Sequence, residues 1–282
     1  MKRLAHLSDL HFGRIDARVV AGLLADLVHT GPDGVVISGD LVQRAKPDHF
    51  AMARAFLEEL PFPYLVVPGN HDIPVYNLIK RFTDPFRLYR RWISADLSPF
   101  HVDDDIAILG LTTARAIGVD FTAGRINRAQ IARIRDVFDP LPDRLFKIVF
   151  AHHPFLPPPD APDTPLVGRH GLALSALESC GVDLILSGHL HRAYTGDAAI
   201  RHPGLSRSIL ASHAATATST RLRGEANAYT LITVDPPRVS FRLRVWDGDR
   251  FTAGSRSDWR KDTDRWVLDT EANPSAPQHP LA

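Results

Sequence analysis

Residues 35–40 are Val35-Val36-Ile37-Ser38-Gly39-Asp40, an apolar run that ends in two small residues and a carboxylate. Four other segments have the same arrangement, with polar side chains directly after a short apolar run: Asp9-Leu10-His11, Gly69-Asn70-His71-Asp72, His152-His153-Pro154 and Gly188-His189-Leu190-His191. Each segment is expected where a strand ends and a loop begins. Ligands bind at such strand ends in α/β sheets, so the five segments indicate one site.

The five segments supply carboxylate, imidazole and amide groups. These donors suit hard or borderline divalent metals. A set of this size can hold two adjacent cations, and a site with two cations hydrolyses phosphate esters. The sequence therefore predicts metal-dependent chemistry on a phosphoester.

The first part of the chain alternates between strand and helix patterns. Predicted strands at 4–8, 34–38 and 64–67 are separated by helical apolar spacing at 17–28 and 49–60. The same alternation continues through strands at 106–111, 145–151 and 183–186 and helices at 128–138 and 172–179. This pattern favours βαβ units with parallel strands.

Three regions depart from this alternation. Residues 73–99 combine aromatic residues and arginines without a strand pattern, which predicts a helical lid beside the site. The proline-rich residues 154–168 can form neither a helix nor a central strand, so we expect an ordered loop over the site. Strand composition without intervening helices predicts antiparallel pairing among residues 208–212, 228–234 and 238–245.

We predict one domain over residues 1–250, which includes the lid insertion at about 73–99, followed by a C-terminal extension over 251–282. The extension is polar and charged, with Trp259 and Trp266 as its expected anchors. Its end, residues 274–282, has the composition of a disordered segment.

Composition excludes several classes of protein. The 282 residues are 44% hydrophobic and 23% charged, as in ordinary globular proteins, and a net charge of +1 gives no field that would favour nucleic acid or an anionic membrane. Cys180 is the only cysteine, so no intramolecular disulfide can form. The sequence shows no signal peptide and no apolar run that could span a bilayer, so we expect a cytoplasmic protein.

Each segment alone also has an ordinary structural explanation. In strict strand geometry Asp9 and His11 would share a face and reach one cation, yet an aspartate there could equally cap a helix. Asp40 could bridge two cations with its two oxygens or serve as an N-cap. Asn70 offers a neutral oxygen ligand but is also a common turn residue.

The histidines of these segments are expected to have different roles. His71 is expected beside the metals, where it could protonate a leaving group, with Asp72 orienting its ring. We interpret His152 as a ligand and His153 as a neighbour that contacts substrate, although spacing alone does not distinguish the two. His189 and His191 form a second pair two residues apart. The other familiar catalytic motifs, such as a Walker loop or a Gly-x-Ser-x-Gly elbow, are missing.

The five motifs together resemble those of the calcineurin-like metallophosphoesterases, over about residues 4–245. The resemblance implies a four-layer α/β/β/α sandwich, in which two mixed sheets are flanked by helices. It also implies two divalent ions, most simply Mn, Fe or Zn. One ion would be held by Asp9, His11, Asp40 and His191, and the other by Asp40, Asn70, His152 and His189.

Within that family the chain looks most like bacterial class III cyclic-nucleotide phosphodiesterases, because of Ser8-Asp9-Leu10-His11-Phe12-Gly13 and of residues 215–227. This likeness implies hydrolysis of a small phosphodiester by hydroxide that the two ions generate. His71 and Asp72 would be catalytic, and the substrate would contact Asn70, His71 and His153. A homodimer is compatible with the likeness.

Other functions fit the same motifs. The alternatives are a nucleotide-sugar or lipid-linked pyrophosphatase, a nuclease, a phosphomonoesterase or phosphoprotein phosphatase, and a non-enzymatic scaffold. The sequence has no basic groove signature of a nuclease. A scaffold would be expected to lose catalytic positions, whereas His71 and every expected ligand are present.

Overall fold

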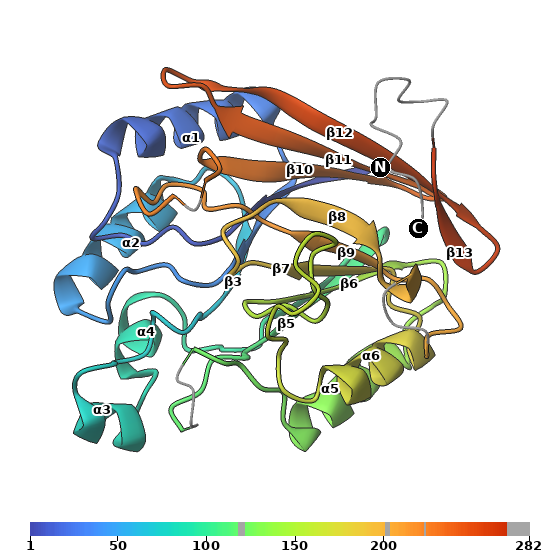
Figure 1. The fold of residues 1–282 in the computed structure, drawn as a ribbon, viewed down its shortest axis with the longest axis horizontal. Helices are drawn as coiled ribbons and strands as arrows, with labels where there is room; N and C mark the ends of the chain where they lie inside the picture. Colours follow the sequence, from blue (N-terminus) through green and yellow to red (C-terminus); the bar gives the residue numbers. More distant parts are fainter. Residues whose placement is uncertain (118–121, 201–203, 223, 270–282) are drawn as a thin grey trace.

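The computed structural model describes residues 1–117, 122–200, 204–222 and 224–269 as two β-sheets that face each other between two layers of helices (Figure 1). In order across the first sheet, the strands are β13 (Arg265–Leu268), β12 (Phe251–Asp262), β11 (Arg238–Trp246), β10 (Ala228–Asp235), β1 (Lys2–Leu7), β2 (Gly34–Ser38) and β3 (Tyr64–Val67). In the second sheet they are β4 (Phe100–Val102), β5 (Ile106–Leu111), β6 (Phe146–Ala151), β7 (Leu184–Ser187), β9 (Leu210–His213) and β8 (Tyr194–Asp197).

Each sheet is mixed. Strands β1, β2 and β3 run parallel, while β10 pairs antiparallel with β1 and begins an antiparallel meander through β13. In the second sheet β5, β6, β7 and β9 run parallel, and β4 and β8 close the edges antiparallel. The predicted four-layer arrangement is therefore confirmed.

Helices α1 (Ala17–Thr30) and α2 (Pro47–Glu59) cover the outer face of the first sheet. Strand alternation explains the layering, because Ala5 and Leu7 point toward these helices while Leu4 packs between the two sheets. Helix α1 begins where the Asp16 side chain accepts a hydrogen bond from the backbone N–H of Arg18.

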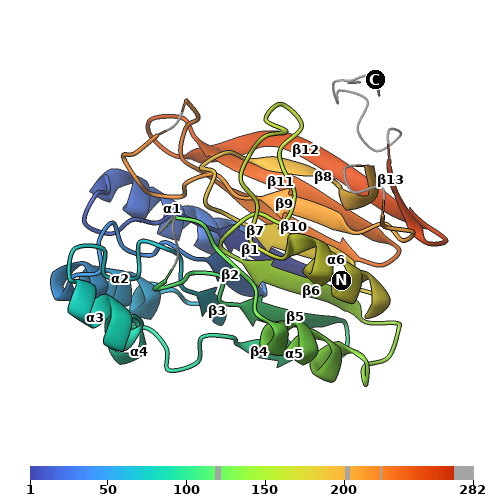
Figure 2. The same ribbon diagram turned by 60° about the horizontal axis from the view of Figure 1, so that its bottom comes forward.

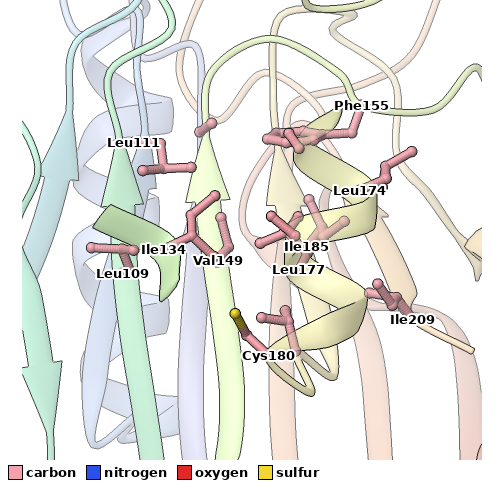
Figure 3. Packing of buried hydrophobic residues seen from close by; sticks show 14 of the residues in the cluster. Leu109, Leu111, Ile134, Val149, Phe155, Leu174, Leu177, Cys180, Ile185 and Ile209 are labelled. Atoms are coloured by element: carbon pink, nitrogen blue, oxygen red, sulfur yellow. The ribbon is translucent and has the colours of Figure 1, made fainter. Parts of the chain in front are cut away.

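Helices α5 (Arg128–Phe138) and α6 (His170–Ser179) cover the outer face of the second sheet (Figure 2). In Figure 3, Val149 and Ile185 point from the sheet toward Ile134 of α5 and Leu177 of α6. The Cys180 thiol is buried at the end of α6, in the same cluster.

The region 73–99 contains two short helices, α3 (Leu78–Thr83) and α4 (Arg87–Trp92), of which α4 lies beside α2 (Figure 1). Residues 154–168 form no helix or strand, in agreement with their proline content. A single 3₁₀ turn, η1 (Ala198–Ile200), follows β8. Among the described residues, no helix combines the length and the apolar composition needed to cross a membrane.

Two expectations about the C-terminal part were wrong. Strand β9 pairs parallel with β7, not antiparallel with its successors, and it belongs to the other sheet. Residues 251–268 are not an extension, because β12 and β13 complete the first sheet. The polar alternation of β12 hid this, since one face of the strand is exposed to solvent.

Trp259 and Trp266 are buried between the sheets, as expected of anchors. The rings of Trp266 and Phe146 meet edge to face at a centroid distance of 5.9 Å and so join the two sheets. The predicted disordered segment, residues 274–282, lies outside the described residues.

Candidate metal centre

All seven predicted ligands lie in loops that follow parallel strands of the two sheets. Asp9 and His11 follow β1, Asp40 follows β2 and Asn70 follows β3, while His152 follows β6 and His189 and His191 follow β7. The structure brings all of them together at the edge between the sheets. This is the strand-end position that the sequence predicted.

The backbone at these positions is not that of a strand. Asp9, His11 and Asp40 all have φ of 53°, and His189 and His191 have φ of 70° and 60°. The expectation of extended geometry for Asp9 and His11 was therefore wrong. Residues other than glycine rarely adopt this left-handed backbone conformation, and each one held in it costs about 1–3 kcal/mol. Such strained residues cluster at functional sites.

The Asp9 carboxylate is held by one oxygen only. Its Oδ2 accepts hydrogen bonds from Oγ of Ser8 at 2.7 Å and from the backbone N–H of His189 at 3.0 Å. Its Oδ1 is buried and has no hydrogen-bond donor among the described residues. That oxygen lies 3.2 Å from Nε2 of His191 and 3.5 Å from Nε2 of His11.

Asp40 lies between two groups of ligands. Its Oδ1 accepts a hydrogen bond of 2.8 Å from the backbone N–H of His71. Its Oδ2 lies 3.4 Å from Nε2 of His152 and 3.9 Å from Nε2 of His11. One carboxylate therefore faces both the histidines of the first sheet's loops and those of the second.

The second group gathers around His152. Its Nε2 lies 3.1 Å from Oδ1 of Asn70 and 3.3 Å from Nδ1 of His189. Its Nδ1 lies 2.9 Å from the backbone carbonyl of Ser38, so Nδ1 donates there and Nε2 is left as the electron-pair donor.

Charges in the site are strongly coupled. Burial alone would raise the pKa of Asp9 and of Asp40, but the surrounding imidazoles outweigh it and hold both pKa values well below the ordinary range. Burial lowers the pKa of His152, yet the negative charge and hydrogen bonding of Asp40 dominate and raise it to about 9. The carboxylates are therefore ionised and ready to bind cations.

The residues fit a pair of divalent ions. The orphaned Oδ1 of Asp9 needs a positive partner, because a buried carboxylate oxygen without one is costly. Ligand atoms of Asp9, His11 and His191 lie within 4.8 Å of one another, and so do those of Asp9, Asp40 and His152. Mixed oxygen and nitrogen donors at this spacing suit transition metals or zinc.

His71 lies at the edge of the ligand cluster. Its side chain is 25% exposed and its Nε2 lies 4.0 Å from Oδ2 of Asp40. Its Nδ1 lies 2.8 Å from the backbone carbonyl of Gln43. Because a carbonyl only accepts, Nδ1 carries the proton and Nε2 is the atom that can gain or lose one.

Asp72 does not contact the His71 ring, contrary to the expectation that it orients the imidazole. Its two oxygens accept backbone N–H groups of Gly69 at 2.8 Å, Val42 at 3.0 Å and Leu41 at 3.3 Å. Burial and the neighbouring charge of Asp40 raise the pKa of Asp72 to about 7. Asp72 thus ties two loops of the site together, and Gln43 orients His71.

His153 is enclosed beside the cluster. Its Nδ1 lies 2.8 Å from Oγ1 of Thr113, and its Nε2 lies 2.8 Å from the backbone carbonyl of Thr122. Its ring packs against that of His189 at a centroid distance of 4.8 Å. Both ring nitrogens are engaged by the protein, which leaves the expected substrate contact without support in this arrangement.

Sequence reasoning missed the residues that hold the first loop in place. Thr216 donates its hydroxyl to the Asp9 carbonyl and Thr218 donates to that of Leu10, each at 2.7 Å. The backbone N–H of Ala217 donates to the carbonyl of Ser8. These residues lie in the stretch 215–227 that suggested a subfamily, but nothing in their composition marks them as supports.

Comparison with known proteins shows that the chain matches a protein family over about two thirds of its length. The model of the family described as calcineurin-like phosphoesterase matches residues 2–193. This range contains every predicted metal ligand and ends before strands β8 to β13.

Two curated relatives are similar in sequence. The chain is 40% identical over 80 residues to the glycerophosphodiester phosphodiesterase GpdQ of Enterobacter lignolyticus (strain SCF1), an alignment that covers 24% of this chain and 29% of that protein. It is 27% identical over 215 residues to a probable cyclic nucleotide phosphodiesterase of Rhodococcus erythropolis, covering 68% of this chain and 65% of that protein. Both alignments therefore span less than two thirds of the relative.

Solved structures share the fold. The purple acid phosphatase PPD1 of yellow lupin (Lupinus luteus) superposes with a TM-score of 0.71 at 11% identity, over 93% of this chain and 54% of that one. A dimetal phosphatase from Danio rerio superposes with a TM-score of 0.62 at 13% identity, over 90% of this chain and 99% of that one.

Proposed function

This chain belongs to the calcineurin-like phosphoesterase family, and we propose that it hydrolyses phosphodiesters at two divalent cations held between its sheets. The observation that carries the proposal is the position of Asp40, whose Oδ2 faces His11 on one side and His152 on the other. A carboxylate in that position can serve two ions at once.

Two sets of residues would hold the ions. Asp9, His11, Asp40 and His191 would bind one, and Asp40, Asn70, His152 and His189 the other. When bound, the cations supply a nucleophile from water and neutralise the phosphoryl oxygens. Mn, Fe and Zn all suit this set of donor atoms, and the availability of each metal decides which one is bound.

The chain's own residues supply the remaining chemistry. His71 carries a proton on Nδ1, fixed by the Gln43 carbonyl, and presents Nε2 to the side of the site that is open to solvent. When protonated, that atom can donate to the departing ester oxygen, and it can regain its proton from water afterwards. The hydrogen bonds of Asp72, Thr216 and Thr218 to the backbone hold the loops that carry the ligands in place.

The preference for diesters draws support from the names of the two curated relatives, both phosphodiesterases. The test is a hydrolysis panel on metal-stripped protein reconstituted with manganese. The panel compares bis-p-nitrophenyl phosphate, p-nitrophenyl phosphate and 3′,5′-cyclic AMP, with Asp40→Asn as the inactive control.

Diester turnover that exceeds monoester turnover, and that disappears in Asp40→Asn, is the expected result. Cyclic AMP turnover would place the chain with the cyclic-nucleotide enzymes. Monoester turnover above diester turnover would overturn the diester proposal. No turnover of any of the three compounds by protein with bound manganese would favour a pyrophosphatase instead.

A further inference from the structure

A cavity of about 350 Å³ lies apart from the metal ligands, between the start of α4 and the start of α5. Its lining includes three arginines together with polar and aromatic side chains: Arg115, Arg125, Arg169, Asn127, Gln130 and Phe86. Its volume is at the lower end of the range of small-molecule pockets, which is roughly 300–1,000 Å³.

Among the residues that the structure describes, the arginines of this cavity have no acidic partner. Within the described ranges, no carboxylate comes within 4.0 Å of the guanidinium groups of Arg115, Arg125, Arg169 or the neighbouring Arg128, whereas eight other arginines there form ion pairs. Like charges that gather without a counter-charge repel one another. Burial lowers the pKa of Arg169, and the charges of Arg125, Arg128 and Arg115 lower it further.

Two of the arginines are held in place by the backbone. Residues 125 and 168 form a parallel bridge, in which Gly168 N–H donates to the Gly124 carbonyl at 2.9 Å and Ile126 N–H donates to the Gly168 carbonyl at 3.0 Å. Arg169 has a left-handed φ of 67°, and its Nη1 donates to the Ile126 carbonyl at 3.4 Å. The two side chains therefore start from neighbouring, fixed backbone positions.

Helix α5 adds to the positive potential. The 11-residue helix begins at Arg128, and its capping box is made by Asn127 and Gln130, which both line the cavity. Gln130 also donates to the carbonyl of Thr112 at 2.6 Å, so this wall is fixed. The amino end of a helix carries about half a positive charge, which favours an anion.

The cavity shares one wall with the metal centre. Thr112 and Ala114 line the cavity, while Thr113 between them bonds to His153. Likewise Arg125 lines the cavity, while a Cβ atom at Gly124 would lie 2.3 Å from Nδ1 of His153. The same two backbone segments thus contact the histidine cluster on one side and the arginines on the other.

We propose that this arginine cavity is a second anion site, which binds a phosphate group separate from the one that is hydrolysed. Guanidinium groups pair with phosphate oxygens in bidentate geometry, and three of them around one cavity suit a dianion. The phosphate could belong to the far end of the substrate or to a separate small molecule.

Binding is tested directly, without reference to turnover. Inorganic phosphate is titrated into the full chain loaded with zinc, a diamagnetic ion that does not broaden nearby signals, and into the same protein with chelator, while the arginine Nε–Hε signals are followed by NMR. We expect saturable shifts of the Arg125 and Arg169 signals that persist with chelator. The Arg125→Gln/Arg169→Gln variant should bind phosphate about tenfold more weakly in the chelator arm.

Arg133→Gln/Arg135→Gln is the matched control, because it removes the same two charges from exposed positions on α5 outside the cavity. It should leave the phosphate affinity unchanged. Equal affinity in the double variant and the wild type would overturn the proposal, and so would shifts that vanish with chelator. If the double variant fails to fold by circular dichroism, Arg125→Gln alone replaces it, because that side chain is exposed.

Kinetics then distinguishes the two sources. A diester that carries a second phosphate on its leaving group should show a lower KM than bis-p-nitrophenyl phosphate, and Arg125→Gln should abolish that difference without changing kcat. If the phosphate comes from a separate molecule, added inorganic phosphate should instead change the rate on bis-p-nitrophenyl phosphate in the wild type and not in the variant. If neither response is seen although phosphate binds, the part of the proposal that names these two sources is wrong.

Discussion

A Cβ atom at Gly69 would lie 2.1 Å from Oδ1 of Asp40 and 2.4 Å from the Asp40 backbone nitrogen. The loop after β3 therefore lies in direct contact with the carboxylate that faces both groups of ligands. The Gly69 N–H also donates to Asp72, so the loop cannot move away without breaking a buried hydrogen bond. The close approach explains why a glycine stands there.

Gly69→Ala should displace Asp40 and weaken metal binding at both positions. We expect manganese content and diester turnover to fall by at least about tenfold, since small misplacements of reacting groups cost that much or more. Gly34→Ala is the control, because a Cβ atom there would meet its nearest neighbour at an ordinary 3.5 Å. Full metal content in Gly69→Ala would show that the loop can accommodate the methyl group without displacing Asp40.

Thr216→Val/Thr218→Val should loosen the loop that carries Asp9 and His11. Each substitution leaves a buried carbonyl without its donor, which costs about 1–3 kcal/mol. We expect weaker manganese binding by calorimetry, about tenfold, with rescue by Thr→Ser at both positions. Thr220→Val, which removes only a 3.4 Å contact at an exposed position of the same segment, should have no effect.

His71→Ala should keep both metals and lose turnover. The side chain is not among the predicted ligands, and removing a general acid costs about 10²–10⁴-fold in rate. The loss should be largest for esters with poor leaving groups and smaller for p-nitrophenyl esters, which leave without help. His29→Ala, at an exposed position on α1, is the control. Full rate on a poor leaving group would rule out the general-acid role.

Asp72→Asn should lower stability more than it lowers turnover. Both carboxylate oxygens accept backbone N–H groups, and an amide can replace only one of them. We expect the free energy of unfolding in urea to fall by about 1–3 kcal/mol, while Asp136→Asn at an exposed position on α5 changes nothing. If Asp72 orients His71 after all, Asp72→Asn will lose as much rate as His71→Ala.

Metal-free protein should lose stability as the pH rises from 6.5 to 9. Despite burial, Asp40 raises the pKa of His152 to about 9 in the folded state. A raised pKa stabilises the folded state below the unfolded value of about 6.5, and this contribution is lost as the pH rises through 9. Urea unfolding with chelator present checks this.

Asp40→Asn should flatten that dependence, because it removes the charge that raises the pKa of His152. Manganese should also offset the loss at high pH, since the neutral imidazole is the form that binds a cation. Stability of the metal-free protein that increases from pH 6.5 to 9 would contradict the assignment of a protonated His152.

Much of this fold could be predicted from strand periodicity and from the position of polar residues after each strand. The strands at 34–38 and 106–111 were predicted with the bounds found in β2 and β5. The C-terminal strands were harder, because β9 inserts between β8 and β7 and pairs parallel with β7, which ends more than twenty residues earlier in the sequence, at Ser187. Pairing partners at that separation leave no local pattern.

The ligand set was predictable because its residue types have few other reasons to follow strands together. Hydrogen bonds between side chains and the backbone could not be predicted in this way. Asp72 was expected beside the His71 ring because the two are adjacent in sequence, yet it turns toward the N–H groups of Val42 and Leu41. The left-handed backbone of Asp9 and Asp40 was not predicted either, because aspartate adopts this conformation only occasionally and nothing local in the sequence marks these two positions.

The place of β1 in the first sheet has a consequence for synthesis on the ribosome. Strand β1 pairs with β2 on one side and with β10 (Ala228–Asp235) on the other, and the Asp9 loop is fastened by Thr216 and Thr218. The nascent chain emerges from its N-terminus, so every ligand up to His191 leaves the ribosome before Thr216, Thr218 and β10 have been made. A chain released early would hold all the ligands and still lack a centre to load with metal.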